Sequence, residues 1–178
     1  RLSYDALIEA TQRYPKRQFV AQFTHPLLVG STLYTGQFME TGGGKDVTMA
    51  FVFVDPDSTW SRKNTPDSAG LRRAIYPLLR RAHGPKNVSP NVFTVGRTSE
   101  TDLVLNDFSI SRHHAEFRIQ KERYFLKDCK ATNGCARNGD RITPGREIEV
   151  FSGDMLSFGR FSFHFTPAEE VYQQLRKV

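Results

Sequence analysis

The chain has few of the residues that build metal centres and disulfide frameworks. Its 178 residues include two cysteines, Cys129 and Cys135. A disulfide framework or a tetrahedral zinc site needs a second pair, so we expect reduced cytosolic thiols. His113 and His114 are adjacent, and on a strand their side chains point to opposite faces, which prevents them from chelating one ion. The sequence therefore predicts no metal site and no cofactor.

Long apolar segments are absent as well. The longest unbroken apolar run, Met49 to Val54, is far shorter than the about 20 residues of a membrane helix. The chain does not open on a basic segment followed by an apolar one, as a secretory leader would. We therefore expect a soluble, cytoplasmic protein that does not bind membranes. Its length is enough for one compact domain with extensions.

Acidic residues are scarce in the first half of the chain. Residues 1–90 carry 12 basic and 7 acidic side chains, whereas residues 91–178 carry 13 and 12, which gives the net charge of +6. Most of the excess lies in a basic stretch at residues 62–86. Such a surface attracts nucleic acid or an acidic protein without sequence specificity. Because the sequence has no zinc-finger, helix-turn-helix or RNA-binding sheet pattern, nucleic acid is not the expected partner.

The spacing of apolar residues predicts a helix at each end of the chain. From Ser3 to Tyr14 apolar side chains recur at helical spacing behind a serine that can cap the helix, and Pro15 ends it. The stretch from Phe19 to Phe38 is broken by proline and glycine, and we expect it to be extended and irregular. At the other end, Thr166-Pro167-Ala168-Glu169 combines a threonine cap, a proline in the first turn and a glutamate, which predicts a terminal helix.

From Val47 onward the pattern changes to short strands separated by turn signals. Val47–Val54 is a predicted strand, and Leu71–Arg81 is a predicted edge strand because Pro77 would break a helix. The further predicted strands are Val92–Val95, Leu103–Leu105, Ala115–Ile119, Tyr124–Lys127, Glu147–Phe151, Met155–Phe158 and Phe161–Phe165. Many short strands without intervening helices indicate an all-β sandwich.

Three short motifs stand where an apolar β-type run gives way to a turn. They are Val95-Gly96-Arg97, Ser111-Arg112-His113-His114 and Thr132-Asn133-Gly134. They offer cationic, hydroxyl and amide donors, without a nucleophile and its base beside them. This combination is typical of a site that binds phosphate, so we do not expect an enzyme.

The first two motifs supply the charged donors. Arg97 at the end of a strand could form a bidentate bond to a phosphate, and Gly96 before it would let the backbone pack closely. Ser111 offers a hydroxyl and an amide, and Arg112 a second planar cation. His114 is expected to be a structural histidine that braces this loop without touching the ligand.

The third motif supplies neutral donors. The hydroxyl of Thr132 could meet the phosphate, and the amide of Asn133 could both donate to and accept from a peptide backbone. Asn-Gly pairs also tolerate a positive φ, and the second pair, Asn138-Gly139, is more simply explained as a hairpin turn.

Together with Asp102-Leu103-Val104-Leu105 and Asn138-Gly139, the three motifs resemble the forkhead-associated (FHA) domain in order and spacing, over about residues 92–165. The resemblance implies an FHA-type two-sheet β-sandwich of about eleven strands, whose loops at one end bind phosphothreonine peptides. It assigns contact with the phosphate to Arg97, Ser111 and Thr132, and contact with phosphate or peptide backbone to Arg112 and Asn133. It assigns structural support of the site to Gly96, His114, Gly134 and Asn138.

The resemblance also sets the expected domain limits. Val47–Val54 and Leu71–Arg81 would be the first two strands of the family's sandwich. The predicted division is therefore an N-terminal helix and irregular extension at residues 1–45, the FHA sandwich at residues 46–166 and a C-terminal helix at residues 167–178.

The implied function is phosphothreonine-dependent binding of a protein or peptide in Ser/Thr kinase signalling, with a kinase or its substrate as the partner. The alternative is a phosphate-independent scaffold that uses the basic residues 62–86 or the N-terminal helix. The N-terminal extension itself contains threonines that, once phosphorylated, could dock into the same or a neighbouring sandwich and so cause self-association. These are Thr11, Thr24, Thr32, Thr35 and Thr41.

Overall fold

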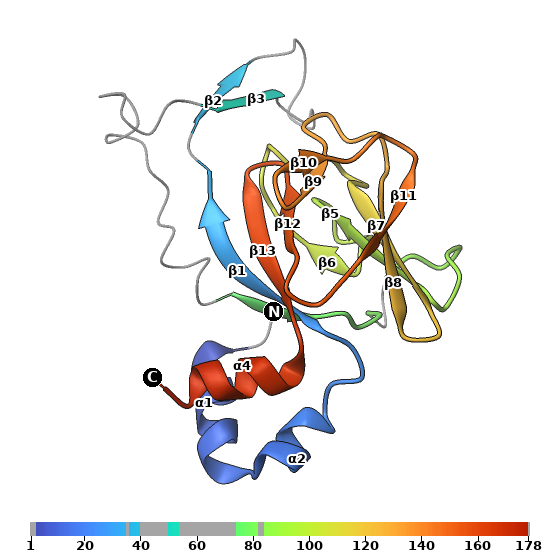
Figure 1. Ribbon diagram of the computed structural model, residues 1–178. Coiled ribbons are helices and arrows are strands. Elements are labelled where there is room, and N and C mark those ends of the chain that lie inside the picture. Colours follow the sequence, from blue (N-terminus) through green and yellow to red (C-terminus); the bar gives the residue numbers. More distant parts are fainter. Residues whose placement is uncertain (1–2, 35, 40–49, 54–73, 82–83, 178) are drawn as a thin grey trace.

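The computed structural model describes residues 3–34, 36–39, 50–53, 74–81 and 84–177. Over these residues the chain is mostly β, and its helices gather at one end of the molecule (Figure 1). The helices are α1 (Tyr4–Arg13), α2 (Lys16–Val20) and α4 (Ala168–Leu175). The glycine-rich segment after residue 40 and most of the basic stretch 62–86 lie outside the described residues.

The first sheet has six strands in the order β10-β9-β12-β13-β1-β4. Their bounds are β1 Leu27–Leu33, β4 Ile75–Pro77, β9 Cys135–Arg137, β10 Asp140–Arg141, β12 Met155–Phe158 and β13 Phe161–Thr166. Neighbouring strands pair antiparallel throughout this sheet. As predicted, the segment around Pro77 forms an edge strand, where a missing N–H group costs least.

The second sheet has five strands in the order β11-β8-β7-β5-β6. Their bounds are β5 Val92–Gly96, β6 Leu103–Val104, β7 Ala115–Gln120, β8 Arg123–Asp128 and β11 Glu147–Val150. The pair β5 and β6 is parallel, and the other pairs are antiparallel. A separate antiparallel ribbon joins β2 (Gly36–Met39) to β3 (Ala50–Phe53).

The two larger sheets enclose an aromatic core. Its largest members are fully buried and come from both sheets: Phe117, Phe158, Phe163, Phe165, Leu126 and Leu156. The rings of Phe117 and Phe165 stack across the core with their centroids 6.0 Å apart. In strands such as β12, alternate residues face this core, which is the burial pattern of a strand in a two-sheet sandwich. The predicted fold class, a two-sheet sandwich of about eleven strands with short terminal helices, is confirmed.

Two segment predictions were wrong. The segment Leu27–Leu33, expected to be extended but irregular, is the regular strand β1 and lies inside the six-stranded sheet between β13 and β4. The segment expected to be the first strand of the sandwich contains β3, whose partner is β2. Strand β1 is held by residues far away in the sequence, since Leu27 pairs with Thr166, and local sequence patterns carry no information on such pairing.

The helices at the chain ends pack against each other and against the start of β1. Ser3 caps α1 as predicted, accepting a hydrogen bond from the Ala6 amide. The cap of α4 is Pro167 rather than the predicted Thr166, whose hydroxyl donates to the carbonyl of His164. A second apolar cluster joins these elements: Leu7, Phe19, Leu27, Ile75, Ala168, Val171, Tyr172 and Leu175.

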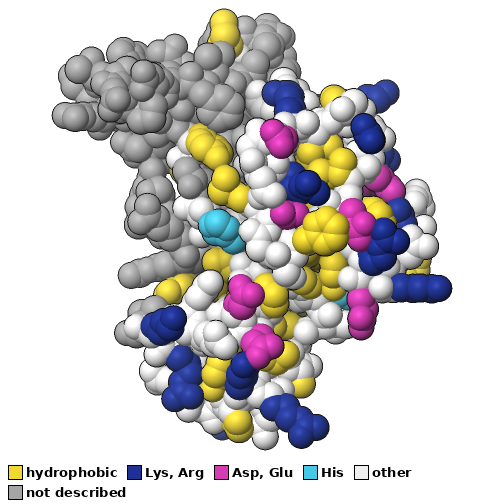
Figure 2. Space-filling model, in the orientation of Figure 1, with side chains coloured by type: hydrophobic (Ala, Val, Ile, Leu, Met, Phe, Trp, Pro, Cys, Tyr) yellow, Lys and Arg dark blue, Asp and Glu magenta, His cyan; other side chains and the backbone are white. Residues whose placement is uncertain are grey.

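Charged side chains are interspersed on the face of the molecule shown in Figure 2, where acidic groups lie among the basic groups over the sandwich and the helices. Among the described residues, the helices are too short and too polar to cross a membrane.

Candidate functional site

Three loops meet at the end of the sandwich that lies away from the helices. They follow β5, precede β7 and follow β8, and each contains one of the three sequence motifs. The Arg97 amide donates to the Ser111 carbonyl at 3.0 Å, and the Thr132 amide donates to the Ser111 Oγ at 3.1 Å. Ser111 is therefore the point at which the three loops are joined, and its hydroxyl keeps a proton to donate outward.

The location of this end follows from strand β13. The amide of Gly159, just before β13, donates to the carbonyl of Gly134 in the third loop at 3.2 Å. The other end of β13 is Thr166, which leads into α4. The loop end and the helix end are thus separated by the full length of β13 (Figure 1).

His114, predicted to support the site, contacts two of the loops from the interior. Its side chain is fully buried, its Nδ1 lies 3.0 Å from the Ser111 amide and its Nε2 lies 3.0 Å from the Gly134 carbonyl. An amide can only donate, so Nδ1 is the acceptor and Nε2 carries the hydrogen that reaches Gly134. Burial lowers the pKa of His114, while the Gly134 carbonyl and the charge of Asp128 oppose this shift. The ring is a neutral bridge between two loops.

The backbone of the first loop packs too tightly for any side chain at Gly96. A Cβ atom there would lie 2.0 Å from the Arg112 carbonyl oxygen and 2.7 Å from the Thr101 methyl group. Gly134 has a φ of +71°, and a Cβ there would meet the guanidinium of Arg141 at 2.6 Å. Close packing of the backbone at Gly96, expected from the sequence, is present.

The predicted donors differ in exposure. Arg112 and Thr132 are exposed at the surface, whereas Ser111 and Arg97 are half-buried. The Arg97 guanidinium carbon lies 5.8 Å from the ring centroid of Phe108, which is 51% exposed. An aromatic ring at this distance attracts the cation and helps to keep it in place. The exposed end of the sandwich therefore combines two cations with two hydroxyl groups.

Asn133 faces inward. Its Nδ2 donates to the Ser109 carbonyl at 2.9 Å, which ties the third loop to the second. The Ser109 amide in turn donates to the carboxylate of Asp107, and Arg160 forms an ion pair with the same carboxylate. Asn133 is predicted to bind phosphate or peptide backbone, and in the structure its side-chain amide already donates to the backbone of the second loop.

Asn138 lies outside the three loops. It follows β9, whereas Gly134 precedes that strand. Its side chain donates to Asp154 at 2.7 Å and accepts from the Met155 amide at 2.8 Å, and its own φ is +52°. These bonds hold the hairpin between β9 and β10 against β12, so Asn138 supports a hairpin rather than the three loops.

A buried carboxylate that the sequence analysis missed shapes the third loop. Asp128, at the end of β8, accepts hydrogen bonds from the Ala131 amide and the Cys135 amide, both at 2.8 Å. These bonds close the turn that presents Thr132. The sequence does contain a signal for this role, since Asp128 stands three residues before Ala131. At that spacing an aspartate side chain can accept a hydrogen bond from a backbone amide.

The cysteines do not provide a nucleophile. Burial raises the pKa of Cys129 to about 12, and the nearby Glu116 adds to the shift. Burial also raises the pKa of Cys135 well above its ordinary value. A raised pKa favours the protonated thiol, which is a poor nucleophile.

Comparison with known proteins gives the family. The family model of the FHA domain matches residues 93–159. The chain is 36% identical over 78 residues to the oxoglutarate dehydrogenase inhibitor of Corynebacterium glutamicum, which is 43% of this chain and 52% of that protein. The chain thus spans about half the length of the first curated relatives that it matches.

A second relative is matched over more of its length. The chain is 30% identical over 140 residues to the glycogen accumulation regulator GarA of Mycobacterium tuberculosis, which is 68% of this chain and 85% of that protein. Among solved structures, EmbR of Mycobacterium tuberculosis in complex with a low-affinity phosphopeptide is 25% identical, with a TM-score of 0.41, over 45% of this chain and 21% of that one. The relatives named here are a regulator and an inhibitor, and on this sequence evidence the chain belongs to the FHA domain family.

Proposed function

We propose that this chain is a phosphothreonine-binding module that recruits a phosphorylated protein or peptide through the three loops. One observation carries the proposal. Ser111 joins all three loops by its carbonyl and its hydroxyl, so Arg97, Arg112 and Thr132 are held around one point. A receptor for phosphate needs convergent donors on a rigid frame, because side chains and loops that are already ordered lose little conformational entropy on binding.

The chemistry of the loops suits a dianionic phosphate. A phosphothreonine carries between one and two negative charges and three strong acceptor oxygens. Arg97 would supply a charge-assisted bond, and the hydroxyl groups of Ser111 and Thr132 would supply neutral ones. Arg112, being exposed, would contribute attraction at longer range. A single phosphate contact of this kind suits an affinity near micromolar, about −8 kcal/mol.

The proposal includes the partner's chemistry. The ligand is a threonine phosphorylated by a Ser/Thr kinase, on the kinase itself or on its substrate. The extra methyl group of threonine, packed in a small apolar pocket, would favour it over serine by about 1–3 kcal/mol. The names of the relatives, a regulator and an inhibitor of a dehydrogenase, are consistent with a protein that acts by binding.

Fluorescence polarisation tests this function. Labelled pools of degenerate peptides containing phosphothreonine, phosphoserine or unphosphorylated threonine are titrated with the wild-type chain, Arg97→Ala and Arg17→Ala. Arg17 is exposed on α2 at the helix end, so its removal changes the net charge equally without touching the loops. We expect saturable binding of the phosphothreonine pool, at least tenfold weaker binding by Arg97→Ala, and no change for Arg17→Ala.

Equal binding of phosphorylated and unphosphorylated pools would overturn the proposal and favour the phosphate-independent scaffold. Equal weakening by Arg97→Ala and Arg17→Ala would show that the phosphopeptides bind by net charge alone.

A further inference from the structure

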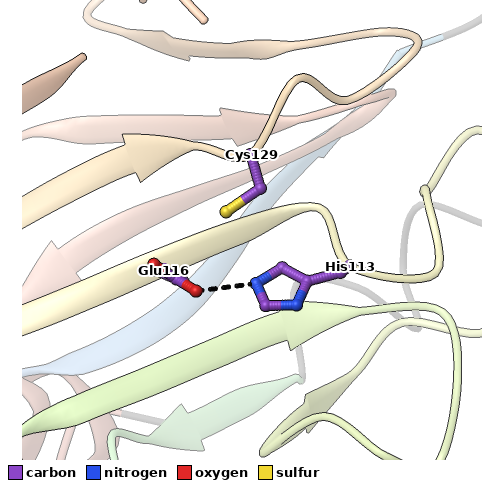
Figure 3. A group of neighbouring side chains, drawn as sticks. All are labelled: His113, Glu116 and Cys129. Atoms are coloured by element: carbon purple, nitrogen blue, oxygen red, sulfur yellow. Dashed lines mark ion pairs between the residues drawn. The ribbon is translucent and has the colours of Figure 1, made fainter. Parts of the chain in front are cut away.

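A second group of polar side chains lies beside the loops, on the outer side of the five-stranded sheet. It consists of His113, Glu116 and Cys129, whose ligand atoms all lie within 4.8 Å of one another (Figure 3). The His113 Nε2 is 3.0 Å from the Glu116 Oε1. The three side chains point toward one another across the junction of two strands.

The pairing of β7 with β8 brings these residues together. Glu116 is on β7, and His113 stands just before that strand. Cys129 directly follows β8, and its amide donates to the His114 carbonyl at 3.0 Å. Glu116 pairs in register with Lys127, so the end of β8 places Cys129 beside the start of β7. The positions are fixed by the sheet and not by a mobile loop tip.

The group has the composition of a metal site. Imidazole, thiolate and carboxylate are the three ligand types that zinc takes in proteins, at about 2.0–2.3 Å from the ion. Ligand atoms of a tetrahedral ion at these bond lengths are about 3.3–3.8 Å apart. The ligand atoms of the three side chains all lie within 4.8 Å of one another, so small side-chain rotations bring them to these distances. We propose that His113, Glu116 and Cys129 bind one zinc ion.

The charges around the group are consistent with a divalent cation. Glu116 uses its two oxygens separately: Oε1 faces His113, and Oε2 lies 3.3 Å from the Lys127 Nζ. Zinc can take Oε1 while Lys127 keeps and orients Oε2, as outer groups commonly do for metal-binding carboxylates. A thiolate and a carboxylate together balance the two charges of the ion, and the thiol proton is released to solvent.

The exposure of these side chains leaves one coordination position of the ion open to solvent. The His113 side chain is 45% exposed, and Glu116 is 24% exposed. Cys129 is half-buried, and its sulfur has a long contact, 4.0 Å, with the Lys127 carbonyl oxygen. Three protein ligands at a solvent-facing site leave the fourth position of a tetrahedral ion to water. The sequence predicts no metal site, because the two histidines are adjacent and the cysteines have no second pair. The proposed site differs from that prediction and takes one histidine and one cysteine.

The experiment uses zinc ions alone and the full chain in the presence of a non-chelating reductant. Competition with a chromophoric chelator gives the stoichiometry and affinity, and cobalt(II) replaces zinc as a spectroscopic probe of a metal–thiolate bond. The variants are His113→Ala, Glu116→Gln and Cys129→Ser, with His164→Ala as the control because His164 is an exposed histidine on β13. Circular dichroism and thermal melting verify that each variant is folded.

We expect one zinc per chain, at least tenfold weaker binding in His113→Ala and Cys129→Ser, and no change in His164→Ala. The thiolate-to-cobalt charge-transfer absorption should be present in the wild-type chain and lost in Cys129→Ser. Absence of stoichiometric zinc binding, or binding that Cys129→Ser and His113→Ala leave unchanged, would overturn the proposal. Since no peptide is involved, the result does not depend on phosphothreonine binding.

Discussion

At the scale of single residues, His114 shows how a buried titratable group can stabilise a loop site. Its two ring nitrogens have different roles, one accepting from the Ser111 amide and one donating to the Gly134 carbonyl. Only the neutral ring can do both, because a protonated imidazole has no acceptor. Protonation would therefore break the bond to Ser111, the residue at which the three loops are joined.

This arrangement predicts a loss of stability in mild acid. Burial lowers the pKa of His114 in the folded chain, whereas in the unfolded chain the group titrates near its ordinary 6.5. As the pH falls below 6.5, His114 binds a proton in the unfolded chain but not in the folded chain. The free energy of unfolding therefore decreases until the pH reaches the pKa of the folded chain. Urea denaturation of the wild-type chain should give a lower free energy of unfolding at pH 5.5 than at pH 7.5.

The variant His114→Gln isolates this effect, since its amide offers a donor and an acceptor but does not titrate. Its free energy of unfolding should change less between the two pH values than that of the wild type. His25, whose pKa burial also lowers, is present in both proteins and cancels in the comparison. An equal pH dependence of the two proteins would contradict the assigned role of His114.

At the scale of elements, the helix end depends on one buried aromatic side chain. Phe19 of α2 is fully buried, and its ring centroid is 5.3 Å from that of Phe23 and 5.3 Å from that of Tyr172 on α4. It links the beginning and the end of the chain. The terminal helices are therefore packed onto the sandwich through a core of their own, next to the start of β1.

The variant Phe19→Ala should lose stability accordingly. Removing a fully buried phenylalanine costs about 3–5 kcal/mol, because apolar burial is lost and a cavity remains. The control is Gln18→Ala, an exposed neighbour on the same helix, which should change the free energy of unfolding by less than about 0.5 kcal/mol. Chemical denaturation measures both. A loss below about 1 kcal/mol in Phe19→Ala would mean that the helix end adds little to the fold.

The elements also show which features of this fold a sequence can reveal. Strands β7 and β12 were predicted nearly to the residue, since both lie between turn signals and β7 also alternates apolar and polar residues. Strand β1 was missed because Gly30 within it reads locally as a break. The Gly30 amide donates to the Ala74 carbonyl, a bond across the sheet that no local pattern encodes.

The residues of the candidate site also differ in how readily a sequence reveals them. The donors Arg97, Ser111 and Thr132 stand in short motifs, so their sequence positions could be identified. The supports Asp128 and Asp107 were not identified, because an aspartate near a turn is common in sequences and its role depends on burial. The ion pair of Asp107 with Arg160 also joins residues far apart in the chain. A sequence reveals donors at turns more readily than the buried groups that position them.

At the scale of the whole molecule, the structure separates binding from the terminal helices. The loops stand at the beginning of β13, and the α-helical cluster stands at its end. Substitutions farther apart than about 7–10 Å and without shared partners usually have additive effects. Strand β13 could still couple the two ends, since it is a continuous element that contacts both.

Two variants and their combination distinguish these cases. Phe19→Ala should leave the dissociation constant of the phosphothreonine pool within about twofold of wild type, measured at a temperature where the variant is folded. Arg97→Ala should weaken binding and leave the loss of stability at Phe19 unaffected. In the double variant the two losses of stability should then sum to within about 0.5 kcal/mol. Two results would contradict this independence: weakening of peptide binding by more than about fivefold in Phe19→Ala alone, or a loss of stability in the double variant that differs from the sum of the single losses by more than about 1 kcal/mol. Either result would mean that β13 transmits changes between its ends, so that the terminal helices regulate the site.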